Sequence, residues 1–193
     1  MSAALVLQAH PNSQRRTDRA SLCLPGTSLC SASLTAKGSS TMAVRAAQFL
    51  ALVVSALALI PSGAHLAALP NKIALPQTEY FTIQTIYNGW AILGLLWPAA
   101  IIANALLAVI VRSQQWPSWF AAFAALCFAF MLAIFFFWTL PANNATANWT
   151  EIPRHWETLR RQWEYSHAAN AVLAFAAFCL TALSATTWRP ANP

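Results

Sequence analysis

The residues of this chain best suited to chemistry lie at the borders of long apolar runs. His65 lies near the end of the first run, and Glu164, His167 and Asn170 lie where the last run begins. An imidazole exchanges a proton near neutral pH, and a carboxylate one helical turn away can orient it. Because helical residues three apart lie on one side, Glu164, His167 and Asn170 are predicted to form one polar face.

Two kinds of cofactor site would use the same side chains. Glu164 and His167 have the i, i+3 spacing with which helix bundles bind metal ions, but dinuclear centres draw acids from several helices. The three earlier apolar runs contain no Asp or Glu. Two histidines on different helices, His65 and His167, could instead be the axial ligands of one haem. We therefore predict no cofactor and no metal ligands, with haem or a single metal ion as the alternatives.

A structural role for the charges is the main alternative to a functional one. Glu157 and Arg161 are four residues apart, and so are Arg160 and Glu164. Opposite charges at this spacing pair along a helix. On this interpretation the two ion pairs stabilise a polar helix, and the histidines are interfacial groups.

These residues belong to a polar stretch, Pro141 to Asn170, between two apolar runs. It holds three of the 5 acidic residues of the chain and three of its 9 tryptophans. The tryptophans and Asn170 recur every seven residues, which places them on one side of a helix. We therefore predict a polar, amphipathic helix from about Glu151 that continues into the last apolar run.

The composition indicates an integral membrane protein. Of the 193 residues, 58% are hydrophobic and only 8% are charged, whereas soluble proteins have about 25% charged residues. Roughly 20 apolar residues cross a bilayer as a helix, and four runs approach or exceed this length: 46–68, 90–111, 119–140 and 167–188. The predicted fold is an all-α, integral membrane four-helix bundle with the lipid bilayer as its partner. Its oligomeric state is left open.

Charge and cysteine content exclude two other classes of function. The net charge of +6 comes from basic residues that are scattered along the chain, whereas nucleic-acid binding needs a clustered basic patch. The 4 cysteines form no CxxC pair and no zinc-finger spacing, so neither a redox motif nor a structural zinc site is predicted.

Residues 1–41 are predicted to be a disordered leader outside the four-span domain, 42–193. They are rich in Ser, Thr and Ala and lack apolar periodicity, which is typical of disorder. An organelle transit peptide has a similar composition. The favoured alternative is that the protein truly starts at Met42, which is followed by Arg45 and an apolar run, and that residues 1–41 are a mis-assigned start. The composition of the first apolar run also fits a cleaved signal peptide. Its length favours a membrane span that is retained in the mature protein.

Helix-breaking residues interrupt two of the predicted spans. Pro61 and Gly63 are predicted to break the first span and to free backbone groups beside His65. Pro98 predicts a kink in the second span. Asn104 is the one strongly polar residue in the interior of that span.

Four alternating spans place the polar segments 70–88 and 141–166 on one face of the membrane. We call these two segments the polar end. At about 1.5 Å per helical residue, four residues at the span borders are predicted to be level with one another: His65, Asn88, Trp138 and His167. The short connection between the second and third spans predicts that they are antiparallel neighbours.

Four strings of the sequence resemble a bacterial family of four-span membrane proteins that is grouped with the fungal anthrone oxygenases. They are NKIALP followed by Tyr80, YNGW at 87–90, PANNATANWT at 141–150 and LRRQWEYSHAANAV at 159–172. The resemblance covers about Val44 to Trp188. It implies a multi-pass protein of the bacterial inner membrane, some of whose fungal relatives oxidise anthrones to anthraquinones with molecular oxygen and no evident metal or flavin.

Chemistry of the kind that this resemblance implies needs a base that removes a proton beside a carbonyl and donors that stabilise the resulting oxyanion. His167 or His65 could be the base. The donors could be Asn170, Asn88 and the arginines, including Arg160. The catalytic residues expected are therefore His167, His65, Glu164 and Asn170, and the substrate-binding residues are Asn88, Trp138, Trp163 and Arg160.

Three classes of function remain open, and whether the protein is an enzyme is undecided at this point. The first is an oxygenase or related oxidoreductase for a lipophilic substrate. The second is a bundle that binds or transports a small molecule or lipid, and the third is a structural or assembly partner of a membrane complex. Transporters usually line their path with ionisable groups or broken helices near mid-membrane, whereas here only Asn104 lies deep. Transport is therefore the less favoured function.

Overall fold

The computed structural model describes residues 28–190, with side chains described from residue 41 onward. The chain divides into two compact units, Met1–Ser40 and Thr41–Pro193. Residues 1–27 of the predicted leader lie outside the described residues, and the described remainder of the first unit is helical. The second unit holds the long apolar helices of the described chain.

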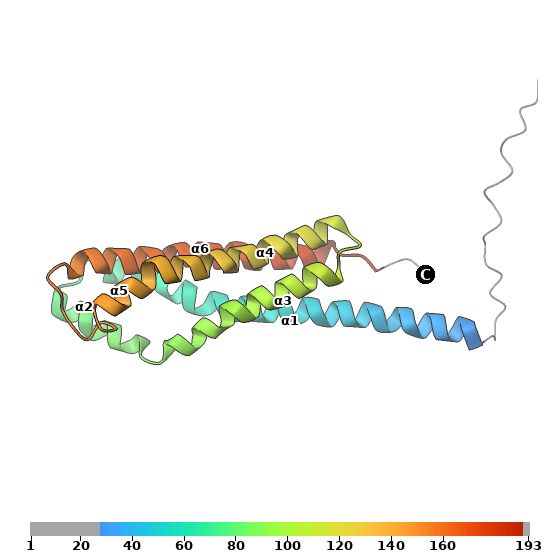
Figure 1. Cartoon of the computed structure of the whole chain (residues 1–193), viewed down its shortest axis with the longest axis horizontal. Coiled ribbons are helices and arrows are strands. Elements are labelled where there is room, and N and C mark those ends of the chain that lie inside the picture. The colour runs from blue at the N-terminus through green and yellow to red at the C-terminus, as the bar shows by residue number, and fades with distance from the viewer. Residues whose placement is uncertain (1–27, 191–193) are drawn as a thin grey trace, which may run out of the picture. The chain divides into compact units, whose positions relative to one another are not determined.

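Every regular element between residues 28 and 190 is a helix (Figure 1). The α-helices are α1 (Ser28–Lys72), α2 (Gln77–Gln84), α3 (Leu96–Ile110), α4 (Gln115–Ile134), α5 (Leu140–Ala145) and α6 (Trp156–Thr187). Two 3₁₀ helices, η1 (Thr85–Tyr87) and η2 (Trp90–Leu95), precede α3, and a π-helix, η3 (Phe135–Thr139), joins α4 to α5.

Four helical segments are long and apolar enough to cross a membrane: Thr41–Lys72, Trp90–Ile110, Gln115–Ala145 and Trp156–Thr187. Their number and order are those predicted from the sequence, and each one overlaps a predicted span. The all-α prediction and the four apolar helices are confirmed.

Buried residues recur at alternating intervals of three and four along the long helices. In α1 they are Val44, Gln48, Ala51, Ser55, Ala58, Ser62 and His65. In α4 they are Pro117, Ala121, Ala124, Phe128 and Met131. This spacing is typical of bundles whose side chains pack as knobs into holes. Helix α4 packs along both α3 and α6 (Figure 1), so the second and third apolar helices are antiparallel neighbours, as predicted.

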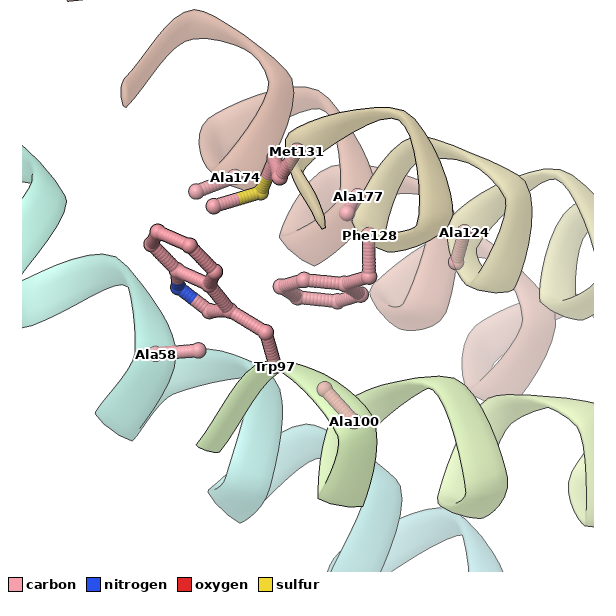
Figure 2. Packing of buried hydrophobic residues seen from close by; sticks show 8 residues of the cluster. All are labelled: Ala58, Trp97, Ala100, Ala124, Phe128, Met131, Ala174 and Ala177. Carbon is pink, nitrogen blue, oxygen red and sulfur yellow. The ribbon is translucent and has the colours of Figure 1, made fainter. Parts of the chain in front are cut away.

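The middle of the bundle is an apolar core built from two large rings and several alanines. Figure 2 shows Trp97 of α3 and Phe128 of α4 lying near each other, with Ala58 of α1 and Ala174 and Ala177 of α6 around them. Small residues let helices approach closely. The alanines of α6 therefore contribute to close packing.

Asn104 has a structural role in a buried polar layer. Its Nδ2 donates to Ser55 Oγ at 3.1 Å, and Thr181 Oγ1 donates to its Oδ1 at 2.8 Å. All three side chains are fully buried. Buried polar groups need such partners, so this layer links α1, α3 and α6 at one level of the bundle.

The predicted break in the first span does not occur. Helix α1 continues through Pro61 and ends at Lys72, so the helix is unbroken beside His65. Packing against neighbouring helices, in which Ala58 of the apolar core takes part, accompanies this continuity, and such packing makes proline tolerable inside apolar helices. Pro98 lies in the first turn of α3, where the helix type changes from 3₁₀ to α.

The polar helix begins at Trp156 and not near Glu151. Ala147, Asn148 and Trp149 have left-handed backbone angles, with φ of 46°, 57° and 66°, so the chain reverses before α6 starts. The prediction that this helix continues without interruption into the last apolar run is confirmed.

The left-handed positions allow a paired test of backbone strain. Gly89 has φ of 85°, and a Cβ added there would meet open space, whereas Ala147 is an exposed alanine at positive φ. We expect Gly89→Ala to lower the free energy of unfolding and Ala147→Gly to raise it, each by about 0.5 to 1 kcal/mol, because only glycine adopts this region without a Cβ penalty. Unfolding in mixed detergent micelles, followed by circular dichroism, measures both. A loss of stability in Ala147→Gly would contradict the left-handed turn.

Candidate functional site

The two segments of the polar end, 70–88 and 141–166, meet at one end of the bundle, as predicted. Tyr80 and Phe81 of α2 form one buried cluster with Trp149, Leu159 and Trp163. Figure 1 shows α2, α5 and the start of α6 at this same end. The aromatic residues of both segments therefore pack into one layer above the apolar core.

A buried ion pair connects the end of α1 to α6. Lys72 Nζ lies 2.9 Å from Glu164 Oε1, and both side chains are almost fully buried. Tyr80 donates its hydroxyl to the same oxygen at 2.9 Å, and Lys72 Nζ donates to Tyr87 Oη at 3.0 Å. Gln84 Nε2 in turn donates to the Tyr80 hydroxyl. Hydrogen bonds to a charged group are the stronger kind, so this network fixes segment 70–88 against α6.

Tyr80 remains a neutral donor in this network. Burial raises the pKa of its hydroxyl well above the usual value of 10.0, and the charge of Glu164 and its hydrogen bond raise it further. A phenol that keeps its proton can continue to donate to the carboxylate.

The ion pairs predicted along the polar helix do not form. In the part of the chain whose side chains are described, the one salt bridge is that between Lys72 and Glu164. Arg160 instead donates to the Leu75 carbonyl at 2.8 Å, and its guanidinium lies 4.6 Å from the ring centre of Trp156. The i, i+4 spacing predicted that Arg160 pairs with Glu164, but Lys72 at the end of α1 is the residue that reaches Glu164 in the folded structure.

The two histidines of the polar end stack on each other. The rings of His65, on α1, and His167, on α6, have centroids 4.0 Å apart and planes inclined by 22°. Trp163 contacts both rings edge-on, at 4.2 Å from His167 and 5.1 Å from His65. The ring centroids of Tyr87 and His65 are 4.4 Å apart. The prediction that His65 and His167 are level with each other is therefore confirmed.

Neither imidazole has a hydrogen-bond partner among residues 41–190, and His65 Nδ1 is buried without one. Leaving a buried polar atom unpaired costs about 1 to 3 kcal/mol, so an imidazole nitrogen that faces a cavity without a partner is a candidate for a functional role. At an effective dielectric constant of about 20, two unit charges 4 Å apart repel by about 4 kcal/mol. The stacked pair therefore carries at most one positive charge and can accept or release a single proton.

A haem between these histidines does not fit the geometry. Axial ligands approach a haem iron from opposite faces of the macrocycle, whereas these rings lie face to face at 4.0 Å with no space for a porphyrin between them. In the described part of the chain, no group of three or more His, Cys, Asp or Glu side chains is placed to hold a metal ion. Glu164, the carboxylate expected beside His167, is paired with Lys72.

A cavity of about 470 Å³ opens beside the histidine pair. Its polar wall contains His65, His167, Gln84, Tyr87, Asn88 and Asn143. Its apolar wall contains Leu93, Leu95, Trp97, Leu132, Phe135 and Phe136. Trp97 also belongs to the apolar core (Figure 2), so the core forms the floor of the cavity.

Irregular helices position the cavity walls. Gly89, in the left-handed region, starts the 3₁₀ helix η2, and the π-helix η3 carries Phe135, Phe136 and Thr139 into the opposite wall. π-helical segments occur frequently at functional sites. The two irregular segments are thus the elements that shape the cavity.

One asparagine of the polar wall has a fixed amide orientation. Asn143 Oδ1 accepts hydrogen bonds from the indoles of Trp163, at 2.8 Å, and Trp149, at 3.2 Å. Because both donors occupy the oxygen, the Nδ2 group of Asn143 is left to donate to a ligand in the cavity.

Four of the eight predicted site residues line this cavity: His65, His167, Asn88 and Trp163. Glu164 and Arg160 do not line it and instead bind segment 70–88. Asn170 is fully buried with both amide atoms unpaired and is not part of the wall. Trp138 is 52% exposed and lines a separate groove with Arg161 and Tyr165.

Four residues of this region had no predicted role: Lys72, Tyr80, Tyr87 and Asn143. Lys72 is the only cation of segment 70–88. That segment was predicted to lie beside segment 141–166, which contains three glutamates, so an ion pair between Lys72 and one of them could have been predicted. Tyr80, Tyr87 and Asn143 lie in the strings NKIALP to Tyr80, YNGW and PANN, which carry the family resemblance but indicate no role for single residues.

No protein-family model, curated protein or solved structure matches this chain. The fold and the site therefore define the class of protein by themselves. It is a bundle of four long apolar helices with an amphipathic cavity at one end and an unpartnered histidine pair on the cavity wall, as far as residues 41–190 describe it.

Proposed function

We propose that this chain is a multi-pass membrane enzyme, in the bacterial inner membrane, that resembles the anthrone oxygenases and oxidises a lipophilic small molecule without a cofactor. The observation that carries the proposal is the stacked pair of His65 and His167, which has no hydrogen-bond partner among the described residues and lines an amphipathic cavity. A base without a protein partner in a ligand-sized cavity is typical of an active site.

The proposed reaction begins with proton transfer to the histidine pair. The substrate contains a CH₂ group conjugated with a carbonyl, and an unprotonated imidazole of His65 or His167 accepts its proton. The negative charge that develops on the carbonyl oxygen receives hydrogen bonds from Asn143 Nδ2 and from the amide of Asn88. Molecular oxygen is the oxidant. The overall change, CH₂ + O₂ → C=O + H₂O, balances in atoms and electrons.

The size and lining of the cavity support a ring-shaped, lipophilic substrate. Its volume of about 470 Å³ lies within the usual range of ligand sites, about 300 to 1,000 Å³. The aromatic side chains Trp97, Phe135 and Phe136 line one wall, and aromatic rings stack favourably against one another.

A binding protein without catalysis is the second candidate, because the same cavity would hold a ligand whether or not a reaction follows. Transport is less well supported. Helix α1 is unbroken beside His65, and the apolar core around Trp97 and Phe128 closes the cavity floor. A purely structural or assembly role does not explain why the histidine nitrogens lack a partner among residues 41–190.

Oxygen uptake tests the proposed function. We expect detergent-purified protein to consume oxygen when anthrone is added, with one O₂ used per anthrone and anthraquinone formed, faster than in micelles without protein. The measurement combines an oxygen electrode with absorbance of the product. Quenching of tryptophan fluorescence by anthrone without oxygen uptake would favour the binding protein. Neither response, or a haem band in the absorption spectrum, would contradict the proposal.

A further inference from the structure

The cavity extends to the outer surface of the bundle between η2 and η3. Leu95 and Phe136 line the cavity, yet 67% of Leu95 and 56% of Phe136 are exposed. Both residues belong to apolar helices long enough to cross a membrane. The surface that they expose would therefore face lipid acyl chains.

Glycine makes this side of the cavity open. Gly94 lies in η2 on the cavity wall, and a Cβ at this position would meet no other atom within 4 Å. A side chain at this position would occupy part of that open space, which glycine leaves free.

The remaining sides of the cavity are more obstructed. Trp97 lines the floor and belongs to the same apolar core as Phe128. At the polar end, Trp149 and Trp163 both donate to Asn143 and are themselves packed in contact, with ring centroids 5.7 Å apart. The apolar gap beside Gly94 is thus the side through which an apolar chain can extend at least cost.

We propose that the ligand is an amphiphile with an alkyl or prenyl tail that enters from the bilayer between η2 and η3. Its polar head lies against His65, His167 and Asn143, and its tail passes Gly94 into the lipid. This inference rests on the proposed function, since it concerns the same cavity and requires the four apolar helices to lie in a membrane.

A series of 4-alkylphenols tests this route in protein reconstituted into phosphatidylcholine vesicles. A tail that stays in lipid adds nothing to binding from the membrane. The dissociation constants of 4-methylphenol, 4-octylphenol and 4-dodecylphenol, expressed per lipid, should therefore agree within about threefold, although each CH₂ raises partition into the membrane by about fourfold. Titration calorimetry, corrected with protein-free vesicles, measures these constants.

Substitution of Gly94 separates the route from the cavity itself. We expect Gly94→Leu to weaken binding of 4-dodecylphenol by about tenfold or more, because the side chain fills the gap where the tail passes. Binding of 4-methylphenol should change much less. Gly63→Leu is the matched control, because Gly63 is equally open but does not line the cavity, and it should leave both ligands unaffected.

The outcomes distinguish this inference from the proposed function. If 4-methylphenol binds but 4-dodecylphenol does not, or if Gly94→Leu and Gly63→Leu behave alike, entry from the bilayer is wrong while the cavity remains a binding site. If no alkylphenol binds the unaltered protein, the use of the cavity for lipophilic ligands fails, and the proposed function fails with it.

Discussion

Glu164→Gln is expected to lower the free energy of unfolding by about 3 to 5 kcal/mol, because it leaves the buried ammonium of Lys72 without its counter-charge. Lys72 Nζ would keep neutral partners: the glutamine amide oxygen, the Tyr87 hydroxyl, and the faces of nearby aromatic rings, whose centroids lie at 4.7 Å for Tyr87 and 5.0 Å for Trp163. These contacts are weaker than an ion pair at 2.9 Å. Unfolding in mixed detergent micelles, followed by circular dichroism, measures the change.

A double-mutant cycle and a matched acid test the cause of this loss. Lys72→Met combined with Glu164→Gln should cost less than the sum of the two single changes, because no unpaired charge then remains buried. Glu157→Gln is the control on the same helix. Glu157 is exposed and has no salt bridge among the described residues, so its replacement should change stability by less than about 0.5 kcal/mol. Equal losses for Glu164 and Glu157 would contradict a buried pair.

The helical architecture was predictable because it depends on long, local patterns. Apolar runs of bilayer length and the continuation of the polar stretch into the last run correspond to α1, α3, α4 and α6. The level of His65 and His167 followed from counting residues along two helices, and their rings are in contact. The length of each apolar run and the rise per helical residue determine the number of spans and the level of each residue. Neither quantity depends on which side chains are in contact.

Pairing between segments was not predictable from spacing alone. The i, i+4 rule assigned Arg160 to Glu164, whereas the structure assigns Lys72, 92 positions earlier by residue number. Trp138 was placed at the level of the histidines, but depth does not fix rotation about the helix, and its ring lines a different groove. The π-helix and the left-handed turn at 147–149 depend on tertiary contacts, so no local pattern indicated them.

The largest functional effect is expected for His167→Ala. If the histidine pair is the base, removing His167 should lower anthrone-dependent oxygen uptake by about 100-fold or more, the usual contribution of a general base. Stability should change much less than in Glu164→Gln, because His167 has no hydrogen bond to a described residue. Oxygen uptake and micelle unfolding of the same preparation separate the two effects. His65→Ala should have a similar effect on activity, since each substitution leaves the remaining imidazole without its stacked partner.

Two tryptophans provide controls for the histidine result. Trp163→Phe keeps an aromatic ring against both histidines but removes the indole bond to Asn143, 2.8 Å long, so we expect a loss of about tenfold from a displaced amide, as for one hydrogen bond. Trp138→Phe changes a ring outside the cavity and should leave activity unchanged. If His167→Ala retains full activity while Trp138→Phe loses it, the reacting groups lie in the groove beside Trp138 and Arg161, and the histidine pair is a structural contact between α1 and α6.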